Sequence, residues 1–237
     1  MKCVFLQPSY IPWRGYFDQI YQADVFVFFD NVQYDKRGWR NRNRIKTPHG
    51  VQWLTIPVHS KGAQTENIPV NQIKISWDRA WNEEHLKTIK MAYARAPYFK
   101  IYAPLVESFY TCRPELLADF TIDTTIALAT HLGITLPRFL SSSNLCVPGS
   151  KTGNKTDRLI NLLKELGAST YISGPSAEDD IEAEKFEAAG INLQYMSYDY
   201  IEYPQLYPPY DPQVSILDLL FMTGPDALKY FSHSKDE

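Results

Sequence analysis

The chain of 237 residues is 44% hydrophobic and 22% charged, with a formal net charge of -3 at pH 7. These values exclude a disordered chain and predict one hydrophobic core, with or without an insert. The small net charge excludes a general attraction to nucleic acid or to an anionic membrane, so a basic function requires a local cluster. No apolar run reaches the roughly 18 residues of a membrane span and no signal-peptide pattern begins the chain, so we expect a cytoplasmic protein.

Short apolar segments separated by glycine and proline predict a strand, helix, strand opening. The expected elements are a strand over 2–6, a helix over 16–22 and a strand over 24–29. A hairpin follows, with strands over 43–47 and 52–58 around His49 and Gly50, and then a strand over 73–76.

The rest of the chain is first helical and then alternating. Helices are expected over 81–93, 101–110 and 116–132, the last ended by Gly133. Thr156 or Asp157 is expected to cap a helix that Gly167 ends. A strand over 170–173, a helix over 176–189 and a strand over 192–195 follow. The segment 203–212 is expected to be irregular, and a last helix begins at 214 with Ser215 or Asp218 as its cap. Such alternation implies crossovers onto a parallel sheet. We therefore predict one α/β domain over 1–237, with a mainly parallel, Rossmann-like sheet and a helical insert over 77–137 between two α/β portions.

The first candidate binding segment lies where the first strand ends and the first helix begins. Its candidate binding residues are Gln7, Tyr10, Trp13, Gly15 and Tyr16. Ligands of open α/β sheets bind at this edge, glycine permits close backbone approach, and aromatic rings stack on a base or a sugar. The alternative is that these aromatic rings only pack the loop.

The second candidate is the arginine-rich segment from Gln33 to Lys46. Arg40, Arg42 and Arg44 alternate, so on an extended strand they would share one face and present planar guanidinium groups to phosphate or carboxylate. Gln33 and Asn41 add neutral donors. A solvated basic edge strand is the alternative interpretation.

Two further segments favour anion binding at a helix start. The loop 148–156 fails the phosphate-loop pattern, but its basic residues, Lys155 among them, lead into a helix N-terminus. Ser173 and Gly174 follow a strand and precede a helix, at the same sheet edge as the first candidate. A plain linker and helix capping by Ser176 are the respective alternatives.

Asp30 and His59 are the candidate catalytic residues. Asp30 ends an apolar strand just before the arginine-rich segment, and His59 follows another apolar strand, so either side chain has the chemistry of a general base. No His, Asp or Cys spacing indicates a metal site, and no cofactor is indicated. Cys3, Cys112 and Cys146 form no CxxC pair, which is typical of a reducing compartment.

Motifs along most of the chain resemble one known family. They are QPSYIPWRGYFD at 7–18, DNVQ at 30–33, WRNR at 39–42, WLTIP at 53–57, KTDRLI at 155–160, YISGP at 171–175 and SILDLLF at 215–221. In these motifs the chain resembles the WbqC-like proteins, which are similar to proteins encoded in bacterial O-antigen and other surface polysaccharide clusters.

The resemblance implies an enzyme of O-antigen (lipopolysaccharide) biosynthesis that acts on a nucleotide-linked amino sugar and forms an amide by acyl or aminoacyl transfer. The acyl donor would be carried on coenzyme A or a carrier protein. In this hypothesis the three arginines bind the pyrophosphate, and aromatic rings near Trp13 stack on the base or sugar. Asp30 or His59 accepts a proton from the amine, and backbone amides near Ser173 and Gly174 stabilise the oxyanion. Cys112 or Cys146 is an alternative acyl carrier.

Two other functions remain open from the sequence. The strand, loop, helix opening resembles that of HxGH nucleotidyltransferases, with Trp13, Arg14, Gly15 and Tyr16 at the motif positions; aromatic rings replace both histidines, so nucleotide binding is expected more than nucleotidyl transfer. The second is a non-catalytic protein that binds a sugar nucleotide for another enzyme of the pathway.

Overall fold

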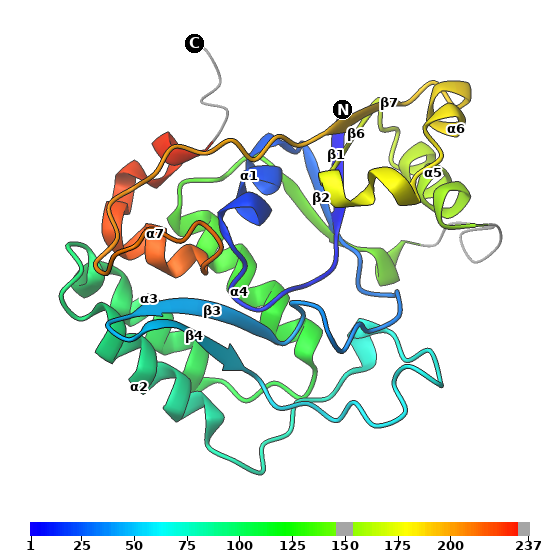
Figure 1. The fold of residues 1–237 in the computed structure, drawn as a ribbon. Helices are drawn as coiled ribbons and strands as arrows, with labels where there is room; N and C mark the ends of the chain where they lie inside the picture. The colour runs from blue at the N-terminus through cyan, green and yellow to red at the C-terminus, as the bar shows by residue number, and fades with distance from the viewer. Residues whose placement is uncertain (146–153, 232–237) are drawn as a thin grey trace.

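A parallel sheet forms the centre of the computed structural model, which describes residues 1–145 and 154–231 (Figure 1). Its strands are β1 (Lys2–Leu6), β2 (Val25–Phe28), β5 (Arg138–Ser141), β6 (Thr170–Ser173) and β7 (Asn192–Tyr195). They lie in the order β5-β2-β1-β6-β7, and every neighbouring pair is parallel. This arrangement confirms the predicted α/β fold with a Rossmann-like sheet.

Both faces of the sheet are covered, which explains why its central strands are apolar throughout. Val4, Phe26 and Phe28 face one core together with helices α1 (Arg14–Gln22), α4 (Leu117–His131) and α7 (Ile216–Thr223). Cys3 and Phe5 face a second core together with α5 (Lys155–Glu165) and α6 (Ala183–Ala188). Successive strand residues alternate between the two cores because their side chains point to opposite faces.

The hairpin and the central helices lie beside the sheet (Figure 1). Strands β3 (Arg42–Thr47) and β4 (Gly50–Thr55) pair antiparallel, and Gly50 turns the chain with φ +100°. Helices α2 (Trp81–Tyr93), α3 (Phe99–Thr111) and α4 follow in the stretch where the sequence predicts a helical insert. In the ranges that the structure describes, no helix has the length and apolar character needed to cross a bilayer. The short 3-10 helices are η1 (Val70–Gln72), η2 (Ser142–Asn144), η3 (Pro175–Asp180) and η4 (Gly224–Tyr230).

One predicted strand was wrong and one strand was missed. The segment 73–76 makes only isolated bridges, Ile75 to Val58 and Lys74 to Leu116, because it runs between the hairpin and α4 without a continuous partner. The missed strand, β5, is a four-residue edge strand that begins directly after a proline and is at least partly exposed along its length. Neither hydrophobic periodicity nor amino-acid composition distinguishes such a short strand from a loop.

Two helix predictions also require correction. The helix expected over 176–189 is divided into η3 and α6, with Ile181 and Glu182 extended between them. Helix α5 begins one residue before the expected caps. Asn154 is its N-cap, because its side chain accepts the Asp157 N–H at 3.0 Å in a capping box.

The proline-rich segment before α7 is irregular, as predicted, and Arg14 of α1 donates to the Tyr210 hydroxyl in it at 3.0 Å. The guanidinium of Arg14 is buried and donates to the carbonyls of Ile201 and Tyr230, each at 2.9 Å. It also lies 4.1 Å from the ring centroid of Tyr200. Arg14 therefore fixes the C-terminal segment on α1 and is a structural residue.

Helix α7 carries a fully buried acid, Asp218, beside Tyr93, Tyr203 and the buried Lys46. Desolvation raises the pKa of Asp218 from 3.8 to about 6, although the Tyr203 and Tyr93 hydroxyls act in the opposite direction. Between these two values the folded chain holds more protons than the unfolded chain. The contribution of Asp218 to stability is therefore full below pH 3.8 and is lost as the pH rises through about 6.

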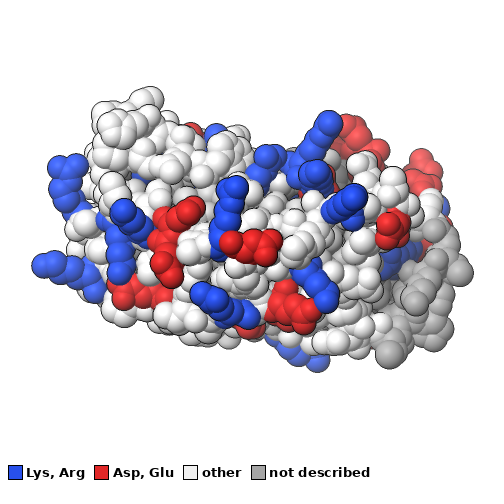
Figure 2. All heavy atoms as spheres, turned by 90° about the horizontal axis from the view of Figure 1, so that it is seen from below, with Lys and Arg blue, Asp and Glu red and all other residues white. Residues whose placement is uncertain are grey.

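Charged side chains are mixed on the molecular face drawn in Figure 2. Basic and acidic groups lie side by side there, without a continuous basic area. This mixture agrees with the small formal net charge of -3. The face drawn there consequently lacks the electrostatic pattern that phosphate backbones require.

Candidate functional site

A cavity of about 450 Å³ lies at the topological switch point of the sheet, between the loops that follow β1 and β6. The chain proceeds from β1 outward to β2 and β5, then returns to place β6 on the other side of β1. Loops after β1 and β6 therefore diverge and leave a crevice at the carboxyl edge of the sheet, where such folds bind ligands. We call this crevice the switch-point cavity.

Aromatic and small polar side chains share the walls of the switch-point cavity. Its apolar and aromatic lining comes from Phe5, Leu6, Pro12, Trp13, Tyr16, Trp39, Tyr171, Ala177 and Tyr198. Its other lining residues are Ser9, Gln19, Arg40, Asn43, Ser173, Gly174, Ser176 and Gln213. The predicted segments around Trp13, Arg40 and Ser173 thus meet at one cavity.

The loop after β1 is held in a fixed and strained shape. Ile11 has φ 35°, which is unfavourable for a β-branched residue. The Asn43 amide donates to the carbonyls of Tyr10 and Ile11 at 3.0 and 2.8 Å, and Ile216 N–H donates to the Pro12 carbonyl at 2.8 Å. These contacts outweigh the local strain and preorganise the cavity wall.

Trp13 forms an aromatic wall because Gly15 makes room for it. A Cβ atom at Gly15 would lie 2.3 Å from Cζ2 of the Trp13 indole. The opposite contact of the indole is Tyr198, with ring centroids 4.9 Å apart in an edge-to-face arrangement at 72°. Tyr16 lies behind them, and its hydroxyl donates to the Gln7 carbonyl at 3.1 Å. Flat faces of this kind suit a base or a sugar ring.

Arg40 supplies the positive charge of the cavity. Its Nη1 donates to Ser9 Oγ at 2.7 Å and to the Gln7 carbonyl at 3.1 Å, and its Nε is buried without a hydrogen-bond partner. Desolvation by burial lowers the pKa of Arg40, although the Asp35 carboxylate acts in the opposite direction, and no acid is among the described residues that line the cavity. Arginine nevertheless keeps its proton in proteins, so an anionic ligand is the natural counter-charge.

The β6 side of the cavity offers an unused acceptor. Gln19 Nε2 donates to the Tyr198 hydroxyl at 2.8 Å, whereas Gln19 Oε1 is buried without a partner. Gly174 passes close to this pair, since a Cβ there would lie 3.3 Å from the Tyr198 hydroxyl oxygen. A ligand N–H or O–H group would satisfy Gln19 Oε1, because buried polar atoms are normally paired.

Tyr10 and Asn41, both predicted binding residues, lie outside the switch-point cavity. Tyr10 is completely buried and its hydroxyl contacts His85 Nδ1 at 2.9 Å and the Tyr110 hydroxyl. Burial lowers the pKa of His85 to about 4, so this histidine is neutral near pH 7. The Asn41 amide donates to the Ile56 carbonyl at 2.8 Å. Both predicted residues hold the hairpin and loop in place.

The three alternating arginines do not converge on one ligand position. Arg42 and Arg44 share a face of the hairpin, with guanidinium carbons 4.8 and 5.8 Å from the ring centroid of Trp53. Arg44 donates to the Gln213 carbonyl at 2.7 and 3.0 Å and lies 3.7 Å from Asp211. Of the three, Arg40 alone lines the switch-point cavity.

The two candidate bases, Asp30 and His59, are also absent from the lining of this cavity. The buried Asp30 carboxylate accepts hydrogen bonds from Ser142 Oγ at 2.9 Å, Ser143 N at 2.8 Å and Ser143 Oγ at 2.6 Å. His59 is exposed, and its backbone N–H donates to the Lys74 carbonyl at 2.9 Å. Asp30 thus connects the end of β2 to the segment after β5.

Lys155, which was predicted to bind an anion, is the first residue of α5 and pairs with a carboxylate of the protein itself. Its exposed ammonium lies 3.0 Å from the Asp180 carboxylate. The rest of that loop, 148–153, and the alternative nucleophile Cys146 lie outside the described residues. The exposed Cys112 donates to the Ser108 carbonyl on α3.

The lining restricts the chemistry that the cavity can perform on its own. Among its described lining residues there is no Asp, Glu, His, Lys or Cys, and burial raises the pKa of Tyr171 and of Tyr198 to about 12. In the described ranges, no cluster of three or more His, Cys, Asp or Glu side chains offers a metal site. The cavity can therefore bind and orient a ligand but has no strong base of its own.

Several lining residues were missed by the sequence predictions. Tyr198 follows β7 within a run of tyrosines, and Gln19 lies one helical turn after Tyr16. Trp39 directly precedes Arg40. Helical spacing of i and i+3 from Tyr16 would have indicated Gln19, whereas no local signal identifies Tyr198.

A family model for the WbqC-like protein family matches residues 7–230. The chain belongs to the WbqC-like protein family. Among curated relatives, this WbqC-like protein is 37% identical over 234 residues to "Uncharacterized protein Rv1507c" of Mycobacterium tuberculosis (strain ATCC 25618 / H37Rv), covering 97% of this chain and 98% of the relative. No solved structure matches the WbqC-like chain significantly.

Proposed function

We propose that this WbqC-like protein binds a nucleotide-linked amino sugar in the switch-point cavity and serves bacterial surface polysaccharide (O-antigen) biosynthesis. One observation carries the proposal: the guanidinium of Arg40 has no acid of the described residues within ion-pair distance and lies in the same cavity as the Trp13 and Tyr198 rings. A diphosphate joined to two rings matches a cavity with one cation and aromatic walls.

The ligand orientation follows from the two ends of the cavity. Phosphate oxygens lie near Arg40 and Ser9, where the guanidinium is already fixed by hydrogen bonds. A ring lies between the aromatic walls and donates to Gln19 Oε1, the acceptor without a partner. This orientation satisfies both a partly buried cation and a buried acceptor with one molecule.

The proposed reaction is acyl or aminoacyl transfer to the sugar amine. The amine nitrogen forms a bond to the carbonyl carbon of a thioester on coenzyme A or a carrier protein, and the carbon–sulfur bond breaks. The amine proton passes through a base, Asp30 or His59 in this hypothesis, to the leaving thiolate. Because no strong base lines the cavity, positioning of the two substrates would supply most of the rate increase.

Incubation with dTDP-linked amino sugars and acyl thioesters, followed by mass detection, tests the transfer. An amide product of the expected mass supports it, whereas calorimetric binding without any mass change would leave a non-catalytic sugar-nucleotide-binding protein. Substituting Asp30 and His59 separates the cases further, since an enzyme that uses either base loses turnover while it keeps ligand affinity.

A second candidate function is a nucleotide-binding enzyme related to the HxGH nucleotidyltransferases. It is favoured by the strand order and by Trp13 and Tyr16, which lie at the histidine positions of that motif and both line the cavity. Arg14 is turned away and bound by the C-terminal segment. Tight, magnesium-dependent ATP binding in calorimetry would favour this function over sugar-nucleotide binding.

A further inference from the structure

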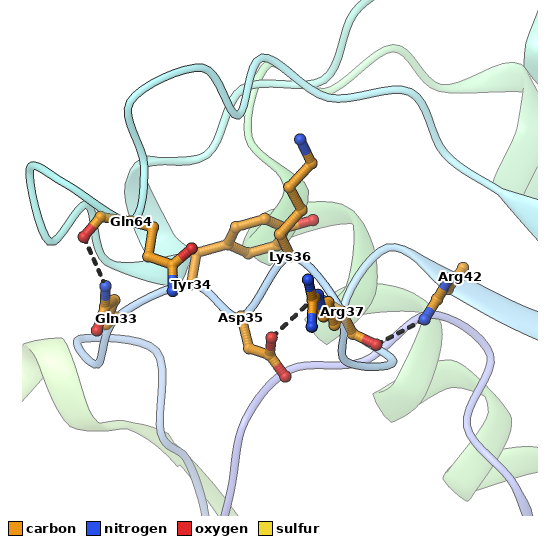
Figure 3. Close-up of a pocket in the computed structure, with 7 residues that line it drawn as sticks. All are labelled: Gln33, Tyr34, Asp35, Lys36, Arg37, Arg42 and Gln64. Atoms are coloured by element: carbon orange, nitrogen blue, oxygen red, sulfur yellow. Dashed lines mark hydrogen bonds between the residues drawn. The ribbon is translucent and has the colours of Figure 1, made fainter.

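A second cavity, of about 620 Å³, lies beside the loop that leads into the hairpin (Figure 3). We call it the basic loop cavity. Its walls come from the segment 33–37, from Arg42 at the start of β3, and from Gln64. Gln33 Nε2 donates to the Gln64 carbonyl at 3.0 Å, and Tyr34 N–H donates to the Ile68 carbonyl at 2.9 Å. These bonds join the two loops that form the cavity.

Positive charge predominates in this cavity. Lys36, Arg37 and Arg42 line it against a single acid, Asp35. The Asp35 carboxylate accepts the backbone N–H of Arg37 at 2.9 Å, and in the described ranges none of the three cations has an acid within ion-pair distance. Three cations around one open space, without counter-charges, fit a ligand with more than one negative group.

Arg42 is the rigid part of the basic loop cavity. Its Nη2 donates to the Arg37 carbonyl at 2.6 Å and its Nε to the Gly38 carbonyl at 3.3 Å, while its guanidinium packs over Trp53. The Asp35 carboxylate packs closely against this turn, because a Cβ at Gly38 would lie 2.6 Å from Asp35 Oδ2. The turn thus fixes one guanidinium and leaves its other N–H groups for a ligand. Figure 3 shows the Lys36 side chain extending from the same loop.

The basic loop cavity is connected to the switch-point cavity through the chain itself. The turn that lines the former continues directly into Trp39 and Arg40, which line the latter. The Arg40 backbone carbonyl in turn accepts Tyr10 N–H at 3.1 Å, so this segment also holds the loop after β1. Two ligands bound on either side of the segment 36–40 would be neighbours.

We propose that the basic loop cavity binds the clustered phosphate groups of a second, phosphorylated substrate. Paired arginine and lysine side chains bind phosphate oxygens, and the cavity is large enough for several phosphate groups. Inorganic polyphosphate and a nucleoside bearing several phosphates, such as coenzyme A, share this chemistry. The site is separate from the sugar-nucleotide site and does not depend on it.

Calorimetry with tripolyphosphate and with coenzyme A, in the Arg40→Met background at low salt, tests the site without the cation of the switch-point cavity. The double change Lys36→Gln and Arg37→Gln removes two exposed cations and should weaken binding by about tenfold. The matched control is Lys87→Gln with Arg95→Gln, which removes the same charge from α2 and the turn after it and should leave the affinity unchanged.

The two ligands identify the source of the phosphates. Stronger binding of coenzyme A than of tripolyphosphate supports an organic phosphorylated substrate, and the reverse supports a free polyphosphate. The proposal is overturned by the absence of binding for both ligands, or by equal losses in the Lys36/Arg37 variant and in the control. Either result leaves the proposed sugar-nucleotide site untouched, because that site is measured with the wild-type Arg40.

Discussion

Replacing Arg40 by methionine is the most direct perturbation of the switch-point cavity. Methionine keeps much of the length and removes the charge. A charge-assisted hydrogen bond to phosphate contributes roughly 1.5–3 kcal/mol, which corresponds to about 10- to 150-fold in the dissociation constant. We expect that loss for a dTDP-linked sugar in isothermal titration calorimetry. Thymidine, which has no phosphate, should bind wild type and variant equally.

The fold should tolerate this change. The Gln7 carbonyl keeps the hydrogen bond from the Tyr16 hydroxyl at 3.1 Å, and Ser9 Oγ keeps its 3.2 Å bond to the same carbonyl. The loss of stability should therefore be about 1 kcal/mol, the net value of an ordinary hydrogen bond. Arg95→Met, at an exposed position that lines neither cavity, is the matched control. Equal affinities of Arg40→Met and wild type for the dTDP-linked sugar would refute the role of Arg40, as would an equal loss of thymidine binding.

Three other substitutions give separate tests. Gly15→Ala should displace the Trp13 indole and weaken ligand binding by about tenfold. Circular dichroism should show an intact fold, since alanine favours helices, and an unchanged ligand affinity would contradict this role of Gly15. Asp30→Ala should lower the free energy of unfolding by about 2–3 kcal/mol in urea titrations with unaltered ligand affinity, because the buried Ser142 hydroxyl and two donors of Ser143 lose a carboxylate acceptor. Between pH 4 and 7, wild type should lose roughly 2–3 kcal/mol of stability relative to Asp218→Asn as the pH rises to about 6; Asp179→Asn, at an exposed position, should follow wild type, and parallel curves for Asp218→Asn and wild type would disprove the pKa shift.

Much of the fold could be predicted because its signals are local. Gly133, Gly167 and Gly190 each have positive φ and each ends a helix at the place that the sequence indicates. The central strands β1 and β6 were predicted with their observed bounds because short segments with strand-favouring residues, Val4 and Phe5 in one and Tyr171 and Ile172 in the other, lie between loop residues. The edge strand β5 was missed because partial exposure removes that pattern.

The sequence indicates where the candidate site lies, but it does not identify all the residues that line it. The carboxyl edge of β1 follows from the α/β pattern, so Trp13 and Tyr16 were expected at that edge, and both line the cavity. Tyr10 has the same composition around it, but it is turned into the core by a backbone angle at Ile11 that no pattern reveals. Tyr198 reaches the cavity from a segment far along the chain, and such a contact depends on tertiary packing alone.

The distribution of charge decides which part of the arginine-rich segment is a binding feature. Alternation alone would assign Arg40, Arg42 and Arg44 one role, yet each has a different set of neighbours. Arg44 is neutralised by Asp211 and by the Gln213 carbonyl, so it stabilises the hairpin against the segment before α7. Arg40 and Arg42 have no acid within ion-pair distance in the described ranges and line two different cavities. An unpaired, fixed guanidinium costs free energy unless an anion joins it, so the two positions that remain unpaired are the ones at which ligands are expected.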